Sequence, residues 1–421
     1  MIQGRDIVFI ASIEWDFLWQ GHQEIASRLA EAGNRVLYIE NTGVRSPGLK
    51  DARRVVHRLQ AWARSLRSKG VRQVAPNLYV CAPLVLPPFG ARWQRQVNRR
   101  LLLPHVRRVV RQLGLRDVLL WTYLPTDTAL DLIRSLRSPK SAVVYYCIAD
   151  FAQLTPQLSQ LERAEKAILT ACDVVFAQGP EIASHCARWN DNVHIFPFGV
   201  NLDAFPLAAS PLEDINTGHT VVDGTDPDCP PAMRNLPRPV IGYIGGLHRH
   251  VDIELLAVMA RARPQWSWVF VGPLQTAVDE LCLLPNVHLV GHQPHNDLVH
   301  YVQRFDVCMV PYVSSSYTDT VVPTKINEYL AVGKPVVSTP LPAVCNFNAK
   351  HEILTVAPAR PEAFLHAIEQ ALRAPADAGT LAWRREVATL GDWQARLEAM
   401  SELIETQLKK KSRRSKSGGR K

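Results

Sequence analysis

Short apolar runs alternate with helical patterns along this 421-residue chain, in two separate series. A strand followed by a helix and another strand indicates a parallel sheet with helices on both faces. We therefore predict an α/β fold with two doubly wound parallel-sheet domains. The first series of predicted strands comprises Ile7–Ala11, Val36–Glu40, Leu78–Ala82, Val118–Thr122, Ala142–Cys147, Val174–Ala177 and Val193–Phe196. The second comprises Val240–Tyr243, Trp268–Val271, Val287–Leu289, Val307–Val310, Val336–Ser338 and Ile353–Val356.

The stretch between the two series is rich in Pro, Asp, Gly and Thr and lacks apolar periodicity. Such a composition is typical of a linker. We therefore divide the chain into a first domain at 1–203, a linker at 204–239 and a second domain at 240–381. A helical pattern follows at 382–408, in which Trp393 is expected to anchor the packing. The basic, low-complexity segment 409–421 is predicted to be disordered.

The composition limits the class of protein. Hydrophobic residues make up 47% of the sequence, yet no run of about 18 uncharged apolar residues would span a membrane. Met1–Ile13 lacks the basic segment, apolar core and cleavage site of a signal peptide. The eight cysteines are scattered without a C-x-x-C pair, which favours reduced thiols and argues against a zinc site. We therefore expect a cytoplasmic protein without a metal site.

The net charge of +9 is concentrated in three segments. Residues 50–72, 92–116 and 409–421 contribute +7, +8 and +8, so the remainder of the chain carries −14. Within the first segment, apolar residues that include Trp62 and Leu66 recur on one predicted helix face. Basic residues beside such a stripe suit an anionic membrane surface, where each contributes on the order of 1 kcal/mol. Nucleic acid is the rival partner, but the ordered motifs resemble no nucleic-acid-binding module.

Residues 323–339 contain the most informative motif. Pro323 suits the first position of a helix, and Gly333 suits its C-terminal end. The predicted helix has Lys325 in its first turn and Glu328 one turn further on. A helix N-terminus beside a lysine attracts a diphosphate, and a nearby carboxylate accepts hydrogen bonds from ribose hydroxyls. The pattern predicts a cradle for a nucleoside diphosphate, although doubly wound domains without one also contain helix–Gly–Pro–strand units.

The same stretch resembles the donor-binding signature of GT-B glycosyltransferases of the family 4 type. There, a carboxylate-bearing helix followed by Ala-x-Gly-x-Pro-Val holds the nucleotide of an activated sugar. Glu328 falls on the second glutamate of the family's E-x7-E pattern, whereas the first falls on Thr320. Asp319 is adjacent and is the candidate substitute. Pro323 and Thr324 complete the segment that the resemblance assigns to donor binding.

Candidates in the first domain follow predicted strands, where open parallel sheets bind ligands. Gly21 and His22 open the first helix, in a stretch that resembles the family's glycine-rich first loop beside the donor diphosphate. Tyr123 stands where many family members carry a catalytic histidine; a tyrosine binds sugar hydroxyls but is a poor base at neutral pH. Asp150 ends a strand, where it could contact substrate hydroxyls or cap the next segment.

The second domain opens with Ile-Gly-Tyr-Ile-Gly-Gly, which resembles the family's Val-Gly-Arg-Leu segment. Gly245 and Gly246 lie in this loop, and Gly246 takes the place of an arginine that neutralises the leaving diphosphate in the family. Arg249 is the candidate replacement for that charge. His292 and Tyr312 follow later strands, whose ends resemble those that frame the nucleotide base and the donor sugar.

The resemblance covers roughly residues 6–405 and implies a GT-B fold, in which two Rossmann-like domains face a cleft and a C-terminal helix crosses back to the first domain. It implies transfer from a nucleotide sugar held by the second domain to a saccharide or lipid-linked acceptor held by the first. Retention of configuration is implied, without a metal or other cofactor. Lys325 and Arg249 would stabilise the leaving group, with Tyr123 and Asp150 as further catalytic candidates.

Two alternatives stay open at this point. A sugar-nucleotide epimerase of GT-B fold would share the cradle but should carry more carboxylates and histidines in its cleft. A non-catalytic GT-B-like scaffold in polysaccharide assembly would explain the missing first glutamate and the missing arginine and histidine. The basic segments add the expectation that the protein is peripheral at the inner face of the membrane.

Overall fold

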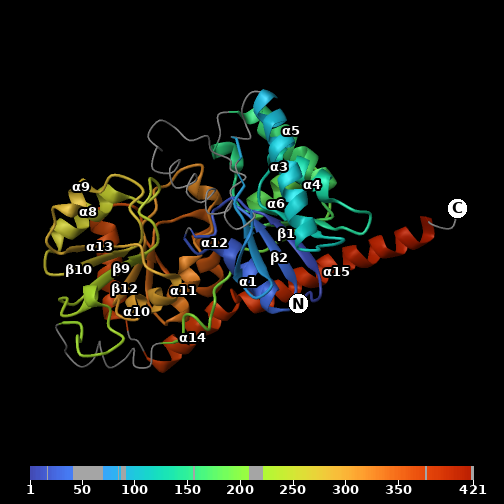
Figure 1. Cartoon of the computed structure of the whole chain (residues 1–421). Coiled ribbons are helices and arrows are strands. Elements are labelled where there is room, and N and C mark those ends of the chain that lie inside the picture. Colours follow the sequence, from blue (N-terminus) through green and yellow to red (C-terminus); the bar gives the residue numbers. More distant parts are fainter. Residues whose placement is uncertain are drawn as a thin grey trace. The chain divides into compact units, whose positions relative to one another are not determined.

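The computed structural model forms two compact units (Figure 1). The first comprises Met1–Pro197 and Gln394–Lys421, and the second comprises Phe198–Trp393. A parallel sheet with helices around it forms each unit. The structure describes residues 1–16, 18–40, 70–83, 85–86, 92–154, 157–207, 221–374 and 377–418.

The sheet of the first unit has the strand order β3-β4-β2-β1-β5-β6-β7-β8. Neighbouring strands are parallel except for β3, which is antiparallel to β4. Central strands such as β6 are continuous buried apolar runs, because helices cover both faces of the sheet. The strands are β1 (Asp6–Ile10), β2 (Arg35–Ile39), β3 (Arg72–Ala75), β4 (Leu78–Cys81), β5 (Leu119–Thr122), β6 (Val143–Cys147), β7 (Val174–Ala177) and β8 (Val193–Ile195).

Side-chain caps start two helices of the first unit. Gln23 accepts the backbone N–H of Gln20 at 3.1 Å at the start of α1, and Thr126 accepts the Ala129 N–H at 3.1 Å at the start of α4. Pro104 lies inside α3 without ending it. The helices are α1 (Gly21–Glu31), α3 (Arg92–Gln112), α4 (Asp127–Leu136), α5 (Leu158–Ala171) and α6 (Pro180–Ala187).

The sheet of the second unit is parallel, with the strand order β11-β10-β9-β12-β13-β14. Its strands are β9 (Val240–Ile244), β10 (Ser267–Val271), β11 (Val287–Gly291), β12 (Val307–Val310), β13 (Val336–Ser338) and β14 (Thr355–Val356). Its helices are α8 (Ile253–Ala262), α9 (Asp279–Cys282), α10 (Leu298–Val302), α11 (Lys325–Ala331), α12 (Pro342–His351), α13 (Pro361–Arg373) and α14 (Ala378–Thr389). The helix α15 (Trp393–Gly418) begins at the edge of this unit and continues in the first.

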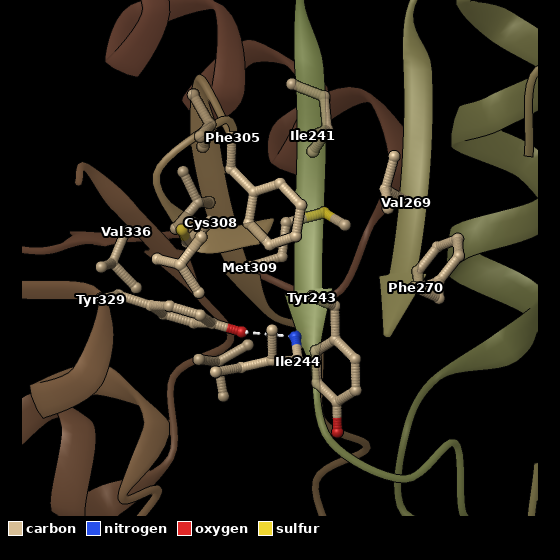
Figure 2. Packing of buried hydrophobic residues seen from close by; sticks show 14 of the residues in the cluster. Ile241, Tyr243, Ile244, Val269, Phe270, Phe305, Cys308, Met309, Tyr329 and Val336 are labelled. Carbon is tan, nitrogen blue, oxygen red and sulfur yellow. Dashed lines mark hydrogen bonds between the residues drawn. The ribbon is translucent and has the colours of Figure 1, made fainter. Parts of the chain in front are cut away.

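Aromatic side chains pack directly on the backbone of β9 (Figure 2). A Cβ atom on Gly242 would lie 2.1 Å from the ring of Phe305, so this glycine makes room for the ring. Tyr329 of α11 points at the end of the same strand, where its hydroxyl accepts the backbone N–H of Ile244 at 2.9 Å. Both rings are fully buried, and together they fix α11 and the segment before β12 on β9.

The predicted linker at 204–239 is not a free connection where the structure describes it. Val222, Cys229 and Met233 are buried in the core of the second unit. The Val222 N–H donates to the carbonyl oxygen of Leu236 at 2.9 Å. The sequence did not predict this because the three apolar side chains follow neither a helical nor a strand period.

The helical pattern at 382–408 is divided between two helices, α14 and α15. Between them, the Val200 N–H donates to the carbonyl oxygen of Gly391 at 2.8 Å, and the Trp393 N–H donates to that of Val200 at 3.1 Å. Trp393 is buried and lies against Gly199, where a Cβ would meet its ring at 2.8 Å. Trp393 therefore packs on Gly199 at the point where the chain leaves the second unit.

The basic segment at 409–421 is more ordered than predicted. Helix α15 continues to Gly418, so most of the segment is helical. Lys411 anchors it, because its Nζ lies 2.8 Å from the Asp173 carboxylate and donates to the Ser141 carbonyl oxygen at 2.7 Å. A charged segment can extend an existing helix, since propagation adds a hydrogen bond per residue without a new nucleus.

The basic segment at 50–72 lies outside the described residues except for its last three. The predicted apolar stripe with Trp62 is among the residues that are not described. Arg72 opens β3, a strand that pattern analysis missed, and its guanidinium lies 2.6 Å from the Asp16 carboxylate.

Two features of the described ranges concern metals and membranes. Over these ranges, no three His, Cys, Asp or Glu side chains gather in a way that could hold a metal ion. None of the helices there combines the length and apolarity of a membrane span. The eight cysteines are all free thiols, and Cys282 and Cys345 are exposed.

Tyr329→Phe should destabilise the second unit by about 1–3 kcal/mol, because the buried Ile244 amide would lose its acceptor. Tyr123→Phe is the matched control: Tyr123 is equally buried, and within the described structure its hydroxyl has no hydrogen-bond partner. Urea denaturation followed by tryptophan fluorescence should show a lower midpoint for Tyr329→Phe and an unchanged or higher one for Tyr123→Phe. Equal midpoints for the two variants would contradict this role of Tyr329.

Candidate functional site

The strand order of the second sheet reverses at β9. From β9 the chain winds outward through β10 to β11, and it then returns to β12 on the other side of β9. Open α/β sheets bind ligands at the carboxyl ends of the two strands at such a reversal. Here those strand ends lead into the loops at Gly245–His250 and Pro311–Tyr312. The topology therefore locates the candidate site independently of any motif.

Lys325, the first residue of α11, reaches these loops. Its Nζ donates to Tyr312 Oη at 2.5 Å. The same Nζ lies 4.8 Å from the ring centroid of Tyr312 and 5.0 Å from that of Tyr243. Two electron-rich ring faces attract a cation and limit the positions that a flexible lysine takes. The tyrosines thus hold one positive charge at the end of β9.

Glycines allow the loop backbone to approach this charge. Gly245 has a φ of 121°, and a Cβ there would lie 3.3 Å from Lys325 Cε. Gly272, after β10, has a φ of 153°, and its Cβ would lie 2.1 Å from the Gly245 carbonyl oxygen. The Gly246 carbonyl oxygen accepts a hydrogen bond from Tyr243 Oη at 3.2 Å. A glycine backbone beside an ammonium group suits a phosphate or diphosphate.

Helix α11 starts two residues later than predicted. Pro323 is buried ahead of it, and Thr324 takes the N-cap position without a side-chain cap in the described structure. Glu328 lies one turn after Lys325, and both residues are half-buried. Because α11 has only seven residues, we assign the positive charge of the site to Lys325 rather than to the helix end.

Asp319 and Thr320 lie in the short turn η5 (Thr318–Thr320) ahead of α11. The turn is held by the buried Thr318, whose hydroxyl donates to the Val313 carbonyl oxygen at 2.7 Å. The Thr320 hydroxyl donates to a carbonyl oxygen three residues back at 2.9 Å. Both candidates are half-buried in this loop, and they remain donor-binding candidates through their place in it.

Arg249 and His292 do not share the tyrosine contacts described for Lys325. Arg249 is exposed, and its Nε lies 3.1 Å from His250 Nε2. His250 in turn stacks on Tyr317 with ring centroids 4.3 Å apart. His292 is exposed after the edge strand β11, which β10 separates from β9. The structure therefore brings together Gly245, Gly246, Tyr312 and Lys325, but not Arg249 or His292.

The sheet of the first unit reverses between β1 and β5, where a second cluster lies. His22 follows the buried Gly21 in α1; its Nε2 is 2.9 Å from Ser12 Oγ, and its ring centroid is 3.9 Å from that of Tyr123. Burial lowers the pKa of His22 to about 3, so its imidazole is neutral near pH 7. Burial also raises the pKa of Tyr123 well above its ordinary value. This cluster offers hydrogen-bonding groups rather than charge.

Asp150 follows β6, the strand beside β5. Its Oδ1 accepts the backbone N–H of Ala152 at 3.0 Å, at the start of the short turn η2 (Phe151–Leu154). Asp150 therefore caps η2, which is one of the two roles that the sequence suggested. A catalytic role for Asp150 stays a prediction.

Comparisons with known proteins agree with this geometry. Residues 238–374 match the family model described as glycosyl transferases group 1. A protein of Bacillus subtilis (strain 168), named as the teichuronic acid biosynthesis glycosyltransferase TuaH, is 34% identical over 158 residues. This match spans 37% of the chain and 40% of that relative's length.

Solved structures extend the likeness to both units. Sucrose-phosphate synthase from Thermosynechococcus elongatus has a TM-score of 0.66 at 20% identity, covering 96% of this chain and 98% of that one. Anabaena HepE in complex with UDP-glucose has a TM-score of 0.62 at 13% identity, covering 95% and 99%. The chain therefore has the GT-B fold, and part of its second unit matches a glycosyltransferase family model.

Three groups of the chain were not named as site residues from the sequence. Tyr243 projects from β9, one residue before the strand ends, and shares the Lys325 cation with Tyr312. His248 lies in the loop after β9, and Ser12 lies two residues after the end of β1. Position relative to a strand end was the available signal in each case. The rule that ligands bind after strand ends selects the whole loops at 12–23 and 245–250, but it does not single out Ser12 or His248 within them.

His22→Gln should remove an acid sensitivity of the fold. The folded pKa of His22, about 3, lies below the ordinary value of 6.5, so below pH 6.5 the unfolded chain takes up a proton that the folded chain excludes. Linkage predicts that this group alone costs the wild type about 2 kcal/mol of unfolding free energy between about pH 7.5 and pH 5. Urea denaturation at both values should show a smaller loss in the variant. His292→Gln, at an exposed position, should lose as much as wild type; equal losses in all three proteins would refute the prediction.

Proposed function

We propose that this chain transfers a glycosyl unit from a nucleoside diphosphate sugar to a saccharide or lipid-linked acceptor. The observation that carries the proposal is the Lys325 ammonium, which Tyr243 and Tyr312 hold beside Gly245 at the strand reversal. Support comes from HepE, which was solved with UDP-glucose, and from TuaH, whose name refers to teichuronic acid biosynthesis. The nucleotide sugar would be a co-substrate, not a resident cofactor.

We further propose a mechanism of the family 4 type, with retention of anomeric configuration. The bond from the sugar to the diphosphate would break ahead of attack by the acceptor hydroxyl, so negative charge would grow on the diphosphate. Lys325 would stabilise this charge, a role assigned here to a side chain rather than to a metal ion. Glu328 would accept hydrogen bonds from the ribose hydroxyls. Arg249 would have to turn away from His250 to add a second charge.

We assign acceptor binding to the cluster of Ser12, His22 and Tyr123 in the first unit. Ser12 is half-buried, whereas His22 and Tyr123, which lie behind it, are fully buried. A sugar hydroxyl would therefore meet the Ser12 hydroxyl first. Because His22 is neutral, it would orient that hydroxyl through Nε2 without adding charge. Gly21 would let the start of α1 approach the substrate.

Lys325→Ala should weaken binding of the nucleoside diphosphate about 10- to 100-fold, because a hydrogen bond to a charged group contributes about 1.5–3 kcal/mol. It should affect the nucleoside much less, whereas Glu328→Ala should weaken both, since both carry the ribose. Titration calorimetry with UDP, GDP and ADP and their nucleosides would measure this. Lys350→Ala, at an exposed position of α12, is the matched control. Equal diphosphate affinities of wild type and Lys325→Ala would overturn the assignment.

Incubation of the purified chain with UDP-, GDP- and ADP-sugars tests the activity itself. A transferase releases the nucleoside diphosphate, slowly to water or faster to an added saccharide acceptor. An epimerase would instead convert one nucleotide sugar into another, and a scaffold would leave all of them intact. Release that is abolished in Lys325→Ala would support transfer.

We also propose that the first unit docks on anionic membranes through α3. One face of this helix is fixed in the unit, because Leu102 and Val106 are buried. Arg95 and Arg99 are held by the Asp131 carboxylate at 3.0 and 2.8 Å. The opposite face is therefore presented outward by a rigid support.

The outward face of α3 is basic and bears apolar side chains. Trp93 is 59% exposed and Leu101 is 63% exposed. The helix sequence contains no Asp or Glu. Exposed arginines beside a tryptophan suit an anionic bilayer surface, where a lipid-linked acceptor would lie at the cytoplasmic face. The further exposed arginines of the helix are Arg100, Arg107, Arg108 and Arg111.

Two double variants of α3 should lose membrane binding in different ways. Arg107→Gln with Arg108→Gln should weaken binding mainly at low salt, because screening removes the attraction of exposed charges at high salt. Trp93→Ser with Leu101→Ser should weaken the binding that persists at high salt. Co-sedimentation with phosphatidylglycerol vesicles measures both, and Arg373→Gln in the second unit serves as control. Wild type that ignores these vesicles at low salt would show the membrane proposal to be wrong.

A further inference from the structure

His248 lies two residues beyond Gly246 and is half-buried beside the candidate diphosphate site. Its ring centroid is 5.7 Å from that of Tyr312, the residue that accepts the hydrogen bond from Lys325 Nζ. Its imidazole therefore belongs to the same cluster as the Lys325 ammonium, although it comes from a different loop.

A backbone hydrogen bond sets the tautomer of this imidazole. The N–H of His250 donates to Nδ1 of His248 at 3.2 Å. A ring nitrogen that accepts such a bond carries no hydrogen, so the hydrogen of the neutral ring is on Nε2. The Nε2–H group is thus a donor whose direction is fixed by the loop.

The charged groups that face His248 are cations. Burial, followed by Lys325 from α11 and by His250 and Arg249 from its own loop, lowers the pKa of His248 to about 4. Tyr312, from the loop after β12, contributes a phenol to the same surroundings. At neutral pH the imidazole is therefore uncharged, and Lys325 supplies the positive charge of the pair.

We propose that His248 binds a phosphoryl oxygen of the donor diphosphate through Nε2–H, as a neutral hydrogen-bond donor beside the Lys325 cation. This proposal deepens the proposed function and rests on it. The two groups would act differently. A cation attracts a phosphate over a range of angles, whereas an N–H donor does so well only near the line of its bond. His248 is therefore a positioning residue, which sets the orientation of the diphosphate that Lys325 attracts.

Equilibrium binding of UDP, GDP and ADP to the full chain near pH 7.5 tests this role. His248→Phe keeps a ring beside Tyr312 but removes the donor, and it should weaken binding about three- to tenfold. In His248→Gln the amide nitrogen reaches the position of Nε2, so its affinity should stay within about twofold of wild type. His288→Phe, at another half-buried histidine of this unit, should also stay within about twofold. Thermal unfolding midpoints verify that each variant is folded.

Salt dependence separates a neutral donor from a cation. Lys325→Ala should flatten the dependence of affinity on salt, because it removes a charge, whereas His248→Phe should keep the wild-type slope. Equal affinities of wild type and His248→Phe, no recovery in His248→Gln, or a flattened slope in His248→Phe would overturn the role of His248 and leave the proposed function intact. If none of the three nucleoside diphosphates binds wild type, both proposals are wrong.

Discussion

One hydrogen bond aligns α11 with β9, and the candidate site depends on that alignment. The Tyr329 hydroxyl accepts the N–H of Ile244, the residue immediately before Gly245. Tyr329 and Lys325 are four residues apart and share one face of α11, so the bond that fixes the first also places the second. The amide would be left unpaired and buried if the helix moved, which is costly. The buried contact of Tyr329 therefore sets the position of the Lys325 ammonium group, which Tyr312 then holds.

In each unit, an uncharged imidazole lies where the strand order of the sheet reverses. His22 is fully buried beside Tyr123, and its pKa is lowered to about 3. His248 is half-buried among cations, and its pKa is lowered to about 4. Burial dominates in both cases, yet the surroundings differ, since His248 lies next to Lys325, whereas His22 lies beside Ser12 and Tyr123. The two imidazoles therefore provide directional hydrogen bonds, whereas the positive charge comes from Lys325.

The architecture follows from sequence because each central strand is a short apolar run between helical patterns. The strand β3 was not predicted because Arg72–Ala75 contains a single large apolar residue. It pairs antiparallel with β4 at the edge of the sheet. Lys325 could be predicted because it follows a recognisable helix start at Pro323, and Gly245 because it follows a recognisable strand end. The direction of Arg249 could not, since a side chain in a loop turns toward partners such as His250 that only the folded chain brings near.

The crossing at Val200 has a consequence for biosynthesis. The chain enters the second unit there, and it leaves beside the same residue, through bonds to Gly391 and Trp393. Everything from Gln394 onward is translated after the entire second unit, yet it belongs to the first. A nascent first unit therefore lacks the Lys411–Asp173 ion pair until more than two hundred further residues have been made. The second unit interrupts the first in the order of synthesis, so the last helix of the first unit is added only after the second unit has been made.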